Sequence, residues 1–297
     1  MDIGSLKSRI LHGTRFPTIF KSEYLEEAFA FRPHDDDIVL RTYPKCGTNW
    51  VKHIILHLLD HENFDGDIAK AQEACPFLEK SGTKGLKPGS LFMTHLPFNV
   101  DTFNPNAKYV IVLRNPRDVA VSFYHFSTRI ATASGDFPKG IYWFPRFAEL
   151  FLKGEIWYGD YMEYHGDMLE GLKKYGRPEN ILFVVYEKMK NHPREEIKRI
   201  AEFIGGKAAD SIKDEKILSM ILERTSVEFM KERADKLSRQ NPDESDEPRR
   251  GTQAVQFVRK GVVGDHVNYF TPEIHKAFDD YIASDPRNKE IMDRFEA

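Results

Sequence analysis

Three short runs of apolar and β-branched residues constrain the fold of this chain more than any other feature of its sequence. They span residues 37–42, 109–113 and 181–186, and each leads into a helical pattern or a polar loop. Such runs are typical of strands buried on both faces of a parallel sheet, and the strand–loop–helix order is typical of βαβ units. The sequence therefore predicts an α/β fold with a central, mostly parallel sheet flanked by helices.

The helix expected after the first run begins near Thr48. Its apolar residues recur with the helical period and form one wide face: Trp50, Val51, Ile54, Ile55, Leu58 and Leu59. The opposite face carries Lys52, His53, His57 and Asp60, and we expect it to be solvated. The two histidines have the spacing of zinc ligands, but no glutamate lies between them as in H-E-x-x-H.

After the second run, Asn115 is expected to cap a helix whose first residue is Pro116 and whose first turn carries Asp118. Residues 235–252 are almost wholly polar and are predicted to form a mobile surface loop. No shift in composition divides the chain, so we expect residues 1–297 to form a single domain with one core.

Composition and charge restrict the class of protein. The two cysteines exclude a disulfide framework, and the formal net charge of −3 gives no electrostatic footprint for nucleic acid. The apolar runs are too short to cross a membrane, and the start of the sequence has no secretory signal. The three acids at 35–37 precede a strand and indicate a polar turn, so no metal site is expected. These features predict a cytoplasmic protein without nucleic-acid or membrane partners.

Residues 43–50, between the first strand and its helix, have the chemistry of an anion site. A helix N-terminus presents free N–H groups and the positive end of the helix dipole. Gly47 permits close approach of the backbone, Lys45 adds a charge and Thr48 a hydroxyl. The segment is not a P-loop, since the lysine precedes the glycine, and by itself it is equally compatible with an ordinary turn.

Two further segments strengthen the anion-site interpretation. Arg114 follows the second strand, with Ser122 about two turns along the next helix, and residues 257–265 form a basic loop bracketed by glycines. Arg259 and Lys260 in that loop are suited to clamp a phosphate. Three candidate anion sites imply a ligand with more than one phosphate-like group.

Four segments together resemble the motif set of the cytosolic sulfotransferases: residues 43–50, 93–97, 114–122 and 259–264. Their order and spacing and the chain length also match, so the resemblance covers essentially the whole chain. It implies an enzyme that uses 3′-phosphoadenosine 5′-phosphosulfate (PAPS) and a single α/β domain similar to the P-loop nucleotide kinases, with a phosphosulfate-binding strand–loop–helix.

The resemblance also implies which residues bind the donor. The 5′-phosphosulfate is expected to contact Lys45, Gly47, Thr48 and Asn49, with Cys46 supplying mainly backbone. The 3′-phosphate is expected to contact Arg114, Ser122, Arg259, Lys260 and Gly261. The adenine is expected to contact Trp50, Tyr186 and Thr225.

The catalytic set implied by the resemblance is His95, Lys45 and Ser122. An acceptor hydroxyl must lose its proton as it attacks sulfur, and a histidine is suited to remove that proton near neutral pH. Lys45 would stabilise the charge on the leaving oxygens. The family acts on phenols, monoamines, steroids and alcohols. The aromatic residues between 137 and 151 favour a small phenolic acceptor and are expected to lie partly in the core and partly in the acceptor pocket.

The sequence departs from the family pattern at several positions. Met93 replaces a common lysine, so one cation near the sulfate is missing, and a lower rate or a lower donor affinity is an open consequence. Val227 replaces a phenylalanine and His266 a tryptophan. The segment usually used for homodimerisation, residues 267–273, is poorly matched, so a homodimer stays an open alternative. Two other functions are also open: a nucleotide or small-molecule kinase, which would require magnesium, and a nucleotide-binding protein that has lost catalysis.

Overall fold

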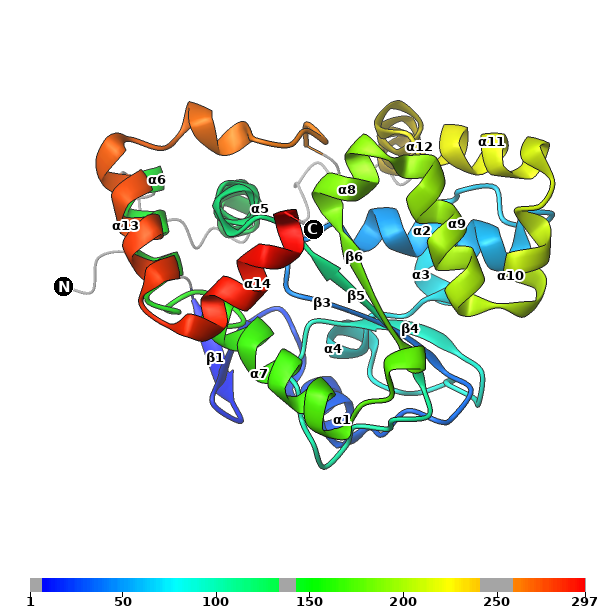
Figure 1. Ribbon diagram of the computed structural model, residues 1–297, viewed down its shortest axis with the longest axis horizontal. Helices are drawn as coiled ribbons and strands as arrows, with labels where there is room; N and C mark the ends of the chain where they lie inside the picture. The colour runs from blue at the N-terminus through cyan, green and yellow to red at the C-terminus, as the bar shows by residue number, and fades with distance from the viewer. Residues whose placement is uncertain (1–6, 134–142, 241–258, 297) are drawn as a thin grey trace.

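A four-stranded parallel sheet forms the centre of the computed structural model, which describes residues 7–133, 143–240 and 259–296 (Figure 1). The strands lie in the order β4 (Leu91–Thr94), β3 (Ile38–Thr42), β5 (Lys108–Leu113) and β6 (Ile181–Val185). Leu40 of β3 pairs with Val110 of β5, which pairs with Leu182 of β6. The α/β prediction is confirmed, and the three predicted strands agree with β3, β5 and β6 to within one residue at each end.

Helices cover both faces of the sheet (Figure 1). On one side lie α2 (Thr48–Asp60), α3 (Ile68–Ala74), α9 (Pro193–Ile204) and α10 (Gly206–Ser211). On the other lie α1 (Ser22–Ala30), α4 (Leu78–Ser81) and α7 (Tyr161–Tyr175). With both faces covered, the strands are buried on both sides: Val110, Ile111 and Val112 of β5 have no exposed surface.

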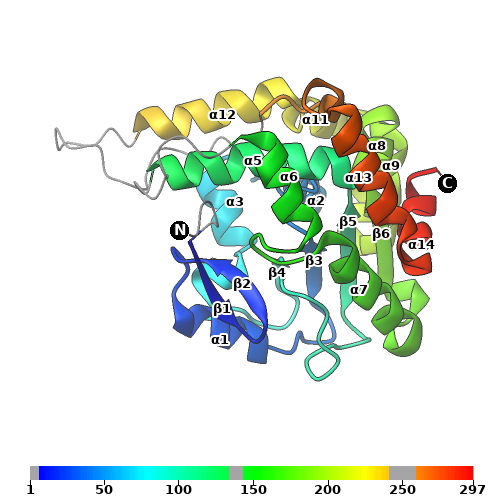
Figure 2. The same cartoon turned by 90° about the vertical axis from the view of Figure 1, so that its left-hand side faces the viewer.

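The remaining elements complete the two ends of the molecule. In Figure 2, α5 (Pro116–Ala133) and α12 (Val227–Gln240) lie at one end, and α1 with the hairpin β1 (Ser8–Leu11) and β2 (Thr14–Pro17) lies at the other. The other helices are α6 (Phe144–Leu152), α8 (Tyr186–Asn191), α11 (Glu215–Arg224), α13 (Pro272–Ala283), α14 (Pro286–Glu296), and the short 3₁₀ turns η1 (Pro178–Asn180) and η2 (Asp265–Asn268). No helix among the described residues is long and apolar enough to cross a membrane.

The carboxyl ends of the four strands meet at one edge of the sheet, as parallel pairing requires. The loops and helix that follow β3, β4, β5 and β6 carry Lys45, His95, Arg114 and Tyr186, respectively. Strand β4 lies on one side of β3, and strands β5 and β6 lie on the other, so the order of the strands reverses at β3. Ligands of open α/β sheets bind in the crevice at such a switch point, so the ligand site is expected at this edge.

The prediction of a solvated face on α2 is wrong. His53 and His57 are buried, and both pack against the ring of Phe64, with centroids 5.6 and 4.6 Å apart. Lys52 is buried as well. The physical reason is that α2 is sandwiched between β3 and the helices α3, α9, α10 and α11, so little of its surface reaches water. Among the described residues, no group of three metal-ligating side chains comes together.

Two other local predictions have clear outcomes. Asn115 caps α5 as expected, since its side-chain oxygen accepts a hydrogen bond from the N–H of Arg117 at 3.0 Å. The polar segment 235–252 was predicted to be a loop throughout, but residues 235–240 are the last turns of α12. The rest of that segment lies outside the described residues.

Candidate functional site

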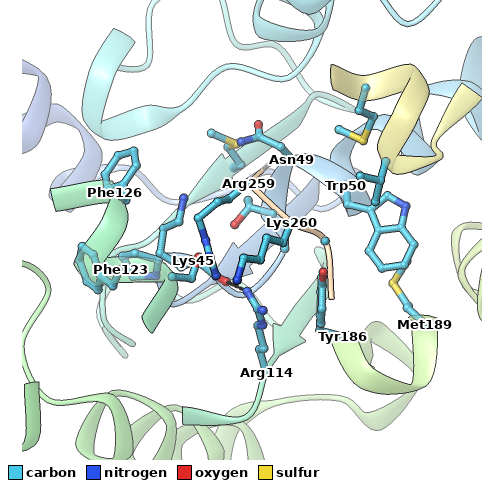
Figure 3. Close-up of a pocket in the computed structure, with 18 of the residues that line it drawn as sticks. Lys45, Asn49, Trp50, Arg114, Phe123, Phe126, Tyr186, Met189, Arg259 and Lys260 are labelled. Atoms are coloured by element: carbon cyan, nitrogen blue, oxygen red, sulfur yellow. Dashed lines mark hydrogen bonds between the residues drawn. The ribbon is translucent and has the colours of Figure 1, made fainter. Parts of the chain in front are cut away.

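A cavity of about 630 Å³ opens at the carboxyl edge of the sheet, a volume within the range of small-molecule sites (Figure 3). Thirteen of the fourteen residues proposed from the sequence line it: Lys45, Gly47, Thr48, Asn49, Trp50, His95, Arg114, Ser122, Tyr186, Thr225, Arg259, Lys260 and Gly261. The exception is Cys46, whose side chain lies in the hydrophobic core. Burial raises the pKa of its thiol, so this side chain is inert there.

The loop between β3 and α2 has an unusual backbone. Lys45 has φ +72° and Gly47 has φ +107°, in the left-handed region that L side chains rarely adopt. A Cβ added at Gly47 would lie 2.8 Å from Cδ2 of Tyr186, so only glycine fits here. Thr48 and Asn49, the first two residues of α2, line the cavity, and the first amides of a helix lack partners within it. The loop therefore forms a cradle for an oxyanion.

Four cations from three segments, Lys45, Arg114, Arg259 and Lys260, converge at this cradle (Figure 3). The Arg114 guanidinium donates to the Lys45 carbonyl at 3.2 Å and lies 4.3 Å from the centre of the Tyr186 ring. Lys260 donates to Asp265 at 2.7 Å, and Arg259 pairs with the same carboxylate. These contacts place the predicted anion-binding residues in one region.

The charge on Lys45 is poorly stabilised by the protein itself. Burial lowers the pKa of its ammonium to about 7, and the charges of Arg129, Arg114 and Arg259 lower it further. Its Nζ lies 4.3 Å from the centre of the Phe126 ring. An anion in the cradle would relieve this repulsion, so the residues present fit a polyanionic nucleotide.

His95 follows β4 and is held in one tautomer. Its Nδ1 lies 2.8 Å from the carbonyl oxygen of Thr42, which can only accept, so Nδ1 carries the proton in the neutral ring. The lone pair of the neutral ring is therefore on Nε2. Burial, together with the charge of Lys45, lowers the pKa of His95 to about 4, which keeps the ring neutral at pH 7. His95 thus has the properties of a general base.

One half of the cavity is apolar, and most of its residues were not predicted. They come from the N-terminal hairpin region, α4, α5 and the segment before α7: Pro17, Ile19, Phe20, Phe77, Phe123, Phe126, Ile130, Trp157 and Tyr158. Phe77 and Tyr158 contact the His95 ring edge-on, with centroids 4.9 and 5.4 Å apart. No sequence motif identifies these residues, because they meet only through the tertiary fold.

The aromatic residues predicted between 137 and 151 do not line the cavity where the structure describes them. Phe144, Phe147 and Phe151 are buried in the core, Trp143 is 66% exposed, and none of these four lines the cavity. Phe137 and Tyr142 lie outside the described residues. The expectation that half of this cluster forms the acceptor pocket is therefore wrong for its described members. Helix α6 packs against α5 and α13, which buries its phenylalanines, and Trp143 faces solvent.

Comparison with known proteins agrees with this geometry. Residues 35–295 match a family model described as the sulfotransferase domain. This chain belongs to the sulfotransferase family. Bovine sulfotransferase 1E1 is 34% identical over 270 residues, which cover 85% of this chain and 83% of the relative. A guinea-pig 3-beta-hydroxysteroid sulfotransferase is 31% identical over 281 residues, 90% of each chain. The crystal structure of mouse sulfotransferase SULT7A1 complexed with PAP has a TM-score of 0.68 and 25% identity, and the match covers 97% of this chain and 96% of that one.

The positions where this sulfotransferase departs from the family pattern can now be placed. Met93 and Val227 both line the cavity, so the changes at these positions alter its wall directly. His266 lies behind the wall, where its Nδ1 donates to Asp118 at 2.8 Å. The same buried carboxylate accepts the N–H of Gly264 at 2.7 Å and thereby fixes the basic loop to the start of α5.

Proposed function

We propose that this sulfotransferase moves the sulfuryl group of PAPS to the hydroxyl of a small phenolic acceptor, with His95 as the general base. The observation that carries the proposal is the position of His95. Its ring contacts Phe77 and Tyr158 of the apolar wall, and the charge of Lys45 acts on it. Its Nδ1 is held by Thr42, so that Nε2 is the basic nitrogen. A base is needed at the junction between a donor site and an acceptor site.

The donor PAPS would bind to the cationic half of the cavity and to Trp50, Tyr186 and Thr225. When bound, PAPS supplies the sulfuryl group and a phosphate that leaves. Lys45, Thr48 and the first amides of α2 would hold the 5′-phosphosulfate, and Lys45 would neutralise the charge that develops on the leaving oxygen. Arg114, Ser122, Arg259, Lys260 and Gly261 would hold the 3′-phosphate, and Trp50, Tyr186 and Thr225 the adenine.

His95 would remove the acceptor proton as the acceptor oxygen attacks sulfur. A ring that is neutral well below pH 7 is in the correct protonation state throughout the physiological range. Sulfuryl transfer resembles phosphoryl transfer, in which positioning and charge stabilisation are the main tasks of the protein. The proton moves to Nε2 while the Thr42 carbonyl holds Nδ1–H, so the imidazolium keeps its orientation.

The acceptor class is proposed from the walls of the apolar half. Aromatic rings such as Phe20, Phe77 and Phe126 suit a planar phenol. Among the described lining residues, Glu228 is the one carboxylate, and it lies at the start of α12 next to Val227. The described apolar wall around His95 therefore has no carboxylate that could pair with an ammonium group. This favours uncharged phenols over protonated monoamines, which remain the second class to be tested.

A transfer assay with radiolabelled sulfate in PAPS, run across phenols, monoamines, sterols and aliphatic alcohols, tests the proposal. We expect phenols to be the best acceptors and His95→Ala to lower turnover by at least about a hundredfold. The matched control is His192→Ala, because the His192 side chain is exposed at the end of α8 and does not line the cavity. If His95→Ala retains more than a tenth of the wild-type turnover, the assignment of the base is wrong. A requirement for magnesium would instead favour a kinase.

A further inference from the structure

The main chain around His95 is hydrogen-bonded to residues 76–79, at the start of α4. Phe77 pairs with Met93 in a parallel bridge, and the N–H of Met93 donates to the carbonyl of Pro76 at 2.9 Å. The next contact along the chain is a side chain: the N–H of His95 donates to Oε1 of Glu79 at 2.6 Å. Glu79 is completely buried, so this is a carboxyl group without access to water.

The residues after His95 are held by a side chain of opposite charge. The guanidinium of Arg41, on β3, donates to the carbonyls of Leu96 and Pro97 at 3.2 and 2.9 Å. The main chain at residues 95–97 is therefore fixed by Glu79 through an N–H group and by Arg41 through two carbonyls. Both contacts are made next to the base.

Glu79 and Arg41 belong to a buried polar cluster that also contains Tyr158 and Tyr164. One atom of each has no hydrogen-bond partner among the described residues: Glu79 Oε2, Arg41 Nε, Tyr158 Oη and Tyr164 Oη. Tyr158 also contacts the His95 ring and has a left-handed backbone, with φ +69°. Strained backbone and unpaired buried polar atoms are costly and are found mainly at functional sites.

We propose that Glu79 is a positioning residue for His95, and that the ionised carboxylate of Glu79 is the form that supports turnover. This inference rests on the proposed role of His95 as the base. Two effects of the negative charge favour the reaction. A carboxylate holds the His95 N–H more firmly than a neutral carboxyl group does. Its charge also stabilises the imidazolium that forms when His95 takes the acceptor proton.

The ionisation of Glu79 falls in the physiological range. Burial raises the pKa of its carboxyl group to about 7, against the hydrogen bond from the His95 N–H and the charge of Arg41, which both lower it. The other groups that face it are the Thr94 hydroxyl and the phenols of Tyr158 and Tyr164. Burial raises the pKa of both phenols, so they stay neutral.

The consequence is a dependence of turnover on pH that His95 alone would not give. The ionised fraction of a group with this pKa rises about tenfold between pH 6 and pH 8, whereas His95, with its pKa near 4, is neutral over that whole range. At saturating PAPS, kcat of the wild type should therefore rise by about tenfold between these two pH values.

Glu79→Gln tests the proposal, because it keeps the size and the accepting oxygen of the side chain but does not ionise. We expect kcat of this variant to be low and nearly independent of pH between pH 6 and pH 8, with an unchanged KM for PAPS. The melting-temperature shift produced by adenosine 3′,5′-bisphosphate should also be unchanged. Glu73→Gln, at an exposed position on α3, should behave as the wild type does.

Three results overturn the proposal: Glu79→Gln with the same pH dependence as the wild type, Glu79→Gln with weakened binding of the bisphosphate, and a wild type with no rise in kcat between pH 6 and pH 8. The last result decides the question even if Glu79→Gln fails to fold. His95→Ala, assayed in parallel, separates this proposal from the proposed function. If His95→Ala is inactive while Glu79→Gln follows the wild-type profile, only the role of Glu79 is wrong. If His95→Ala stays active, the assignment of the base is wrong, and the role of Glu79 with it.

Discussion

Binding of the donor should draw a proton from solution, because the ammonium of Lys45 is poorly stabilised in the free protein. Its pKa is about 7 without ligand, lowered by burial and by neighbouring arginines. A phosphate in the cradle would restore the pKa toward the ordinary value of 10.5. Above pH 7 the free protein is mostly deprotonated at Lys45, so the ligand must bind together with a proton.

The magnitude follows from linkage. Between about pH 8 and the raised pKa of the complex, each pH unit should weaken the binding of adenosine 3′,5′-bisphosphate by about tenfold, or about 1.4 kcal/mol, and between pH 7 and pH 8 by about fivefold. The affinity at pH 9 should therefore be about fiftyfold lower than at pH 7, because Lys45 is already half deprotonated at pH 7. The sign is fixed by the direction of the shift: the protonated form binds, and it is lost as the pH rises.

Isothermal titration calorimetry in two buffers with different ionisation enthalpies measures the effect directly. At pH 8, where both phosphates of the ligand are almost fully ionised, the wild type should take up about 0.9 proton per bisphosphate. Lys45→Met should bind more weakly and take up no proton at pH 8. Lys260→Ala should also bind more weakly but keep the uptake, because the cation that gains the proton is still present. An affinity that is constant from pH 7 to pH 9, or uptake that persists in Lys45→Met, would refute the reasoning.

Three further predictions concern selectivity, backbone and acid stability. Adenosine 3′,5′-bisphosphate should raise the melting temperature far more than adenosine 5′-monophosphate, and Arg114→Ala should shrink the gap, because charged hydrogen bonds to the 3′-phosphate contribute about 1.5–3 kcal/mol each. Gly47→Ala should weaken bisphosphate binding at least about tenfold in calorimetry, since the new methyl group would lie 2.8 Å from Tyr186. Burial lowers the pKa of His53 and His165 to about 3, so the unfolded chain binds more protons below pH 6.5. Each of these two histidines should lower the unfolding free energy by about 2 kcal/mol between pH 6.5 and pH 5. In urea titrations, His165→Phe should therefore lose less unfolding free energy over that interval than the wild type does.

The parts of the structure that could be predicted from the sequence are those set by neighbouring residues. The strand ending at Thr42, the glycine turn at Gly47 and the cap at Asn115 each depend on local backbone chemistry, and all three are present. A parallel sheet then brings the ends of its strands to one edge, which explains why the guanidinium of Arg114 reaches the carbonyl of Lys45.

Other features depend on packing between distant segments and left no local pattern. The four residues of β4 are a strand because they lie beside β3, and nothing in their own sequence distinguishes them. His57 looks like a surface residue on a helical wheel, yet helices that pack on α2 bury it. Glu79 lies sixteen residues before the backbone N–H that it accepts, and only the fold brings the two together.

Asp265 pairs with both Arg259 and Lys260 and so partly neutralises the proposed 3′-phosphate site. Asp265 is buried and also accepts from Asn268 at 2.9 Å, so it is fixed in place whether or not a ligand is present. A phosphate that binds there must displace Asp265 from Arg259 and Lys260 or share these two cations with it. Binding then becomes an exchange of counterions whose free energy depends on the fit of a particular phosphate. A surface of this kind has little attraction for passing polyanions, and affinity for the right nucleotide should depend less on salt than the number of cations suggests.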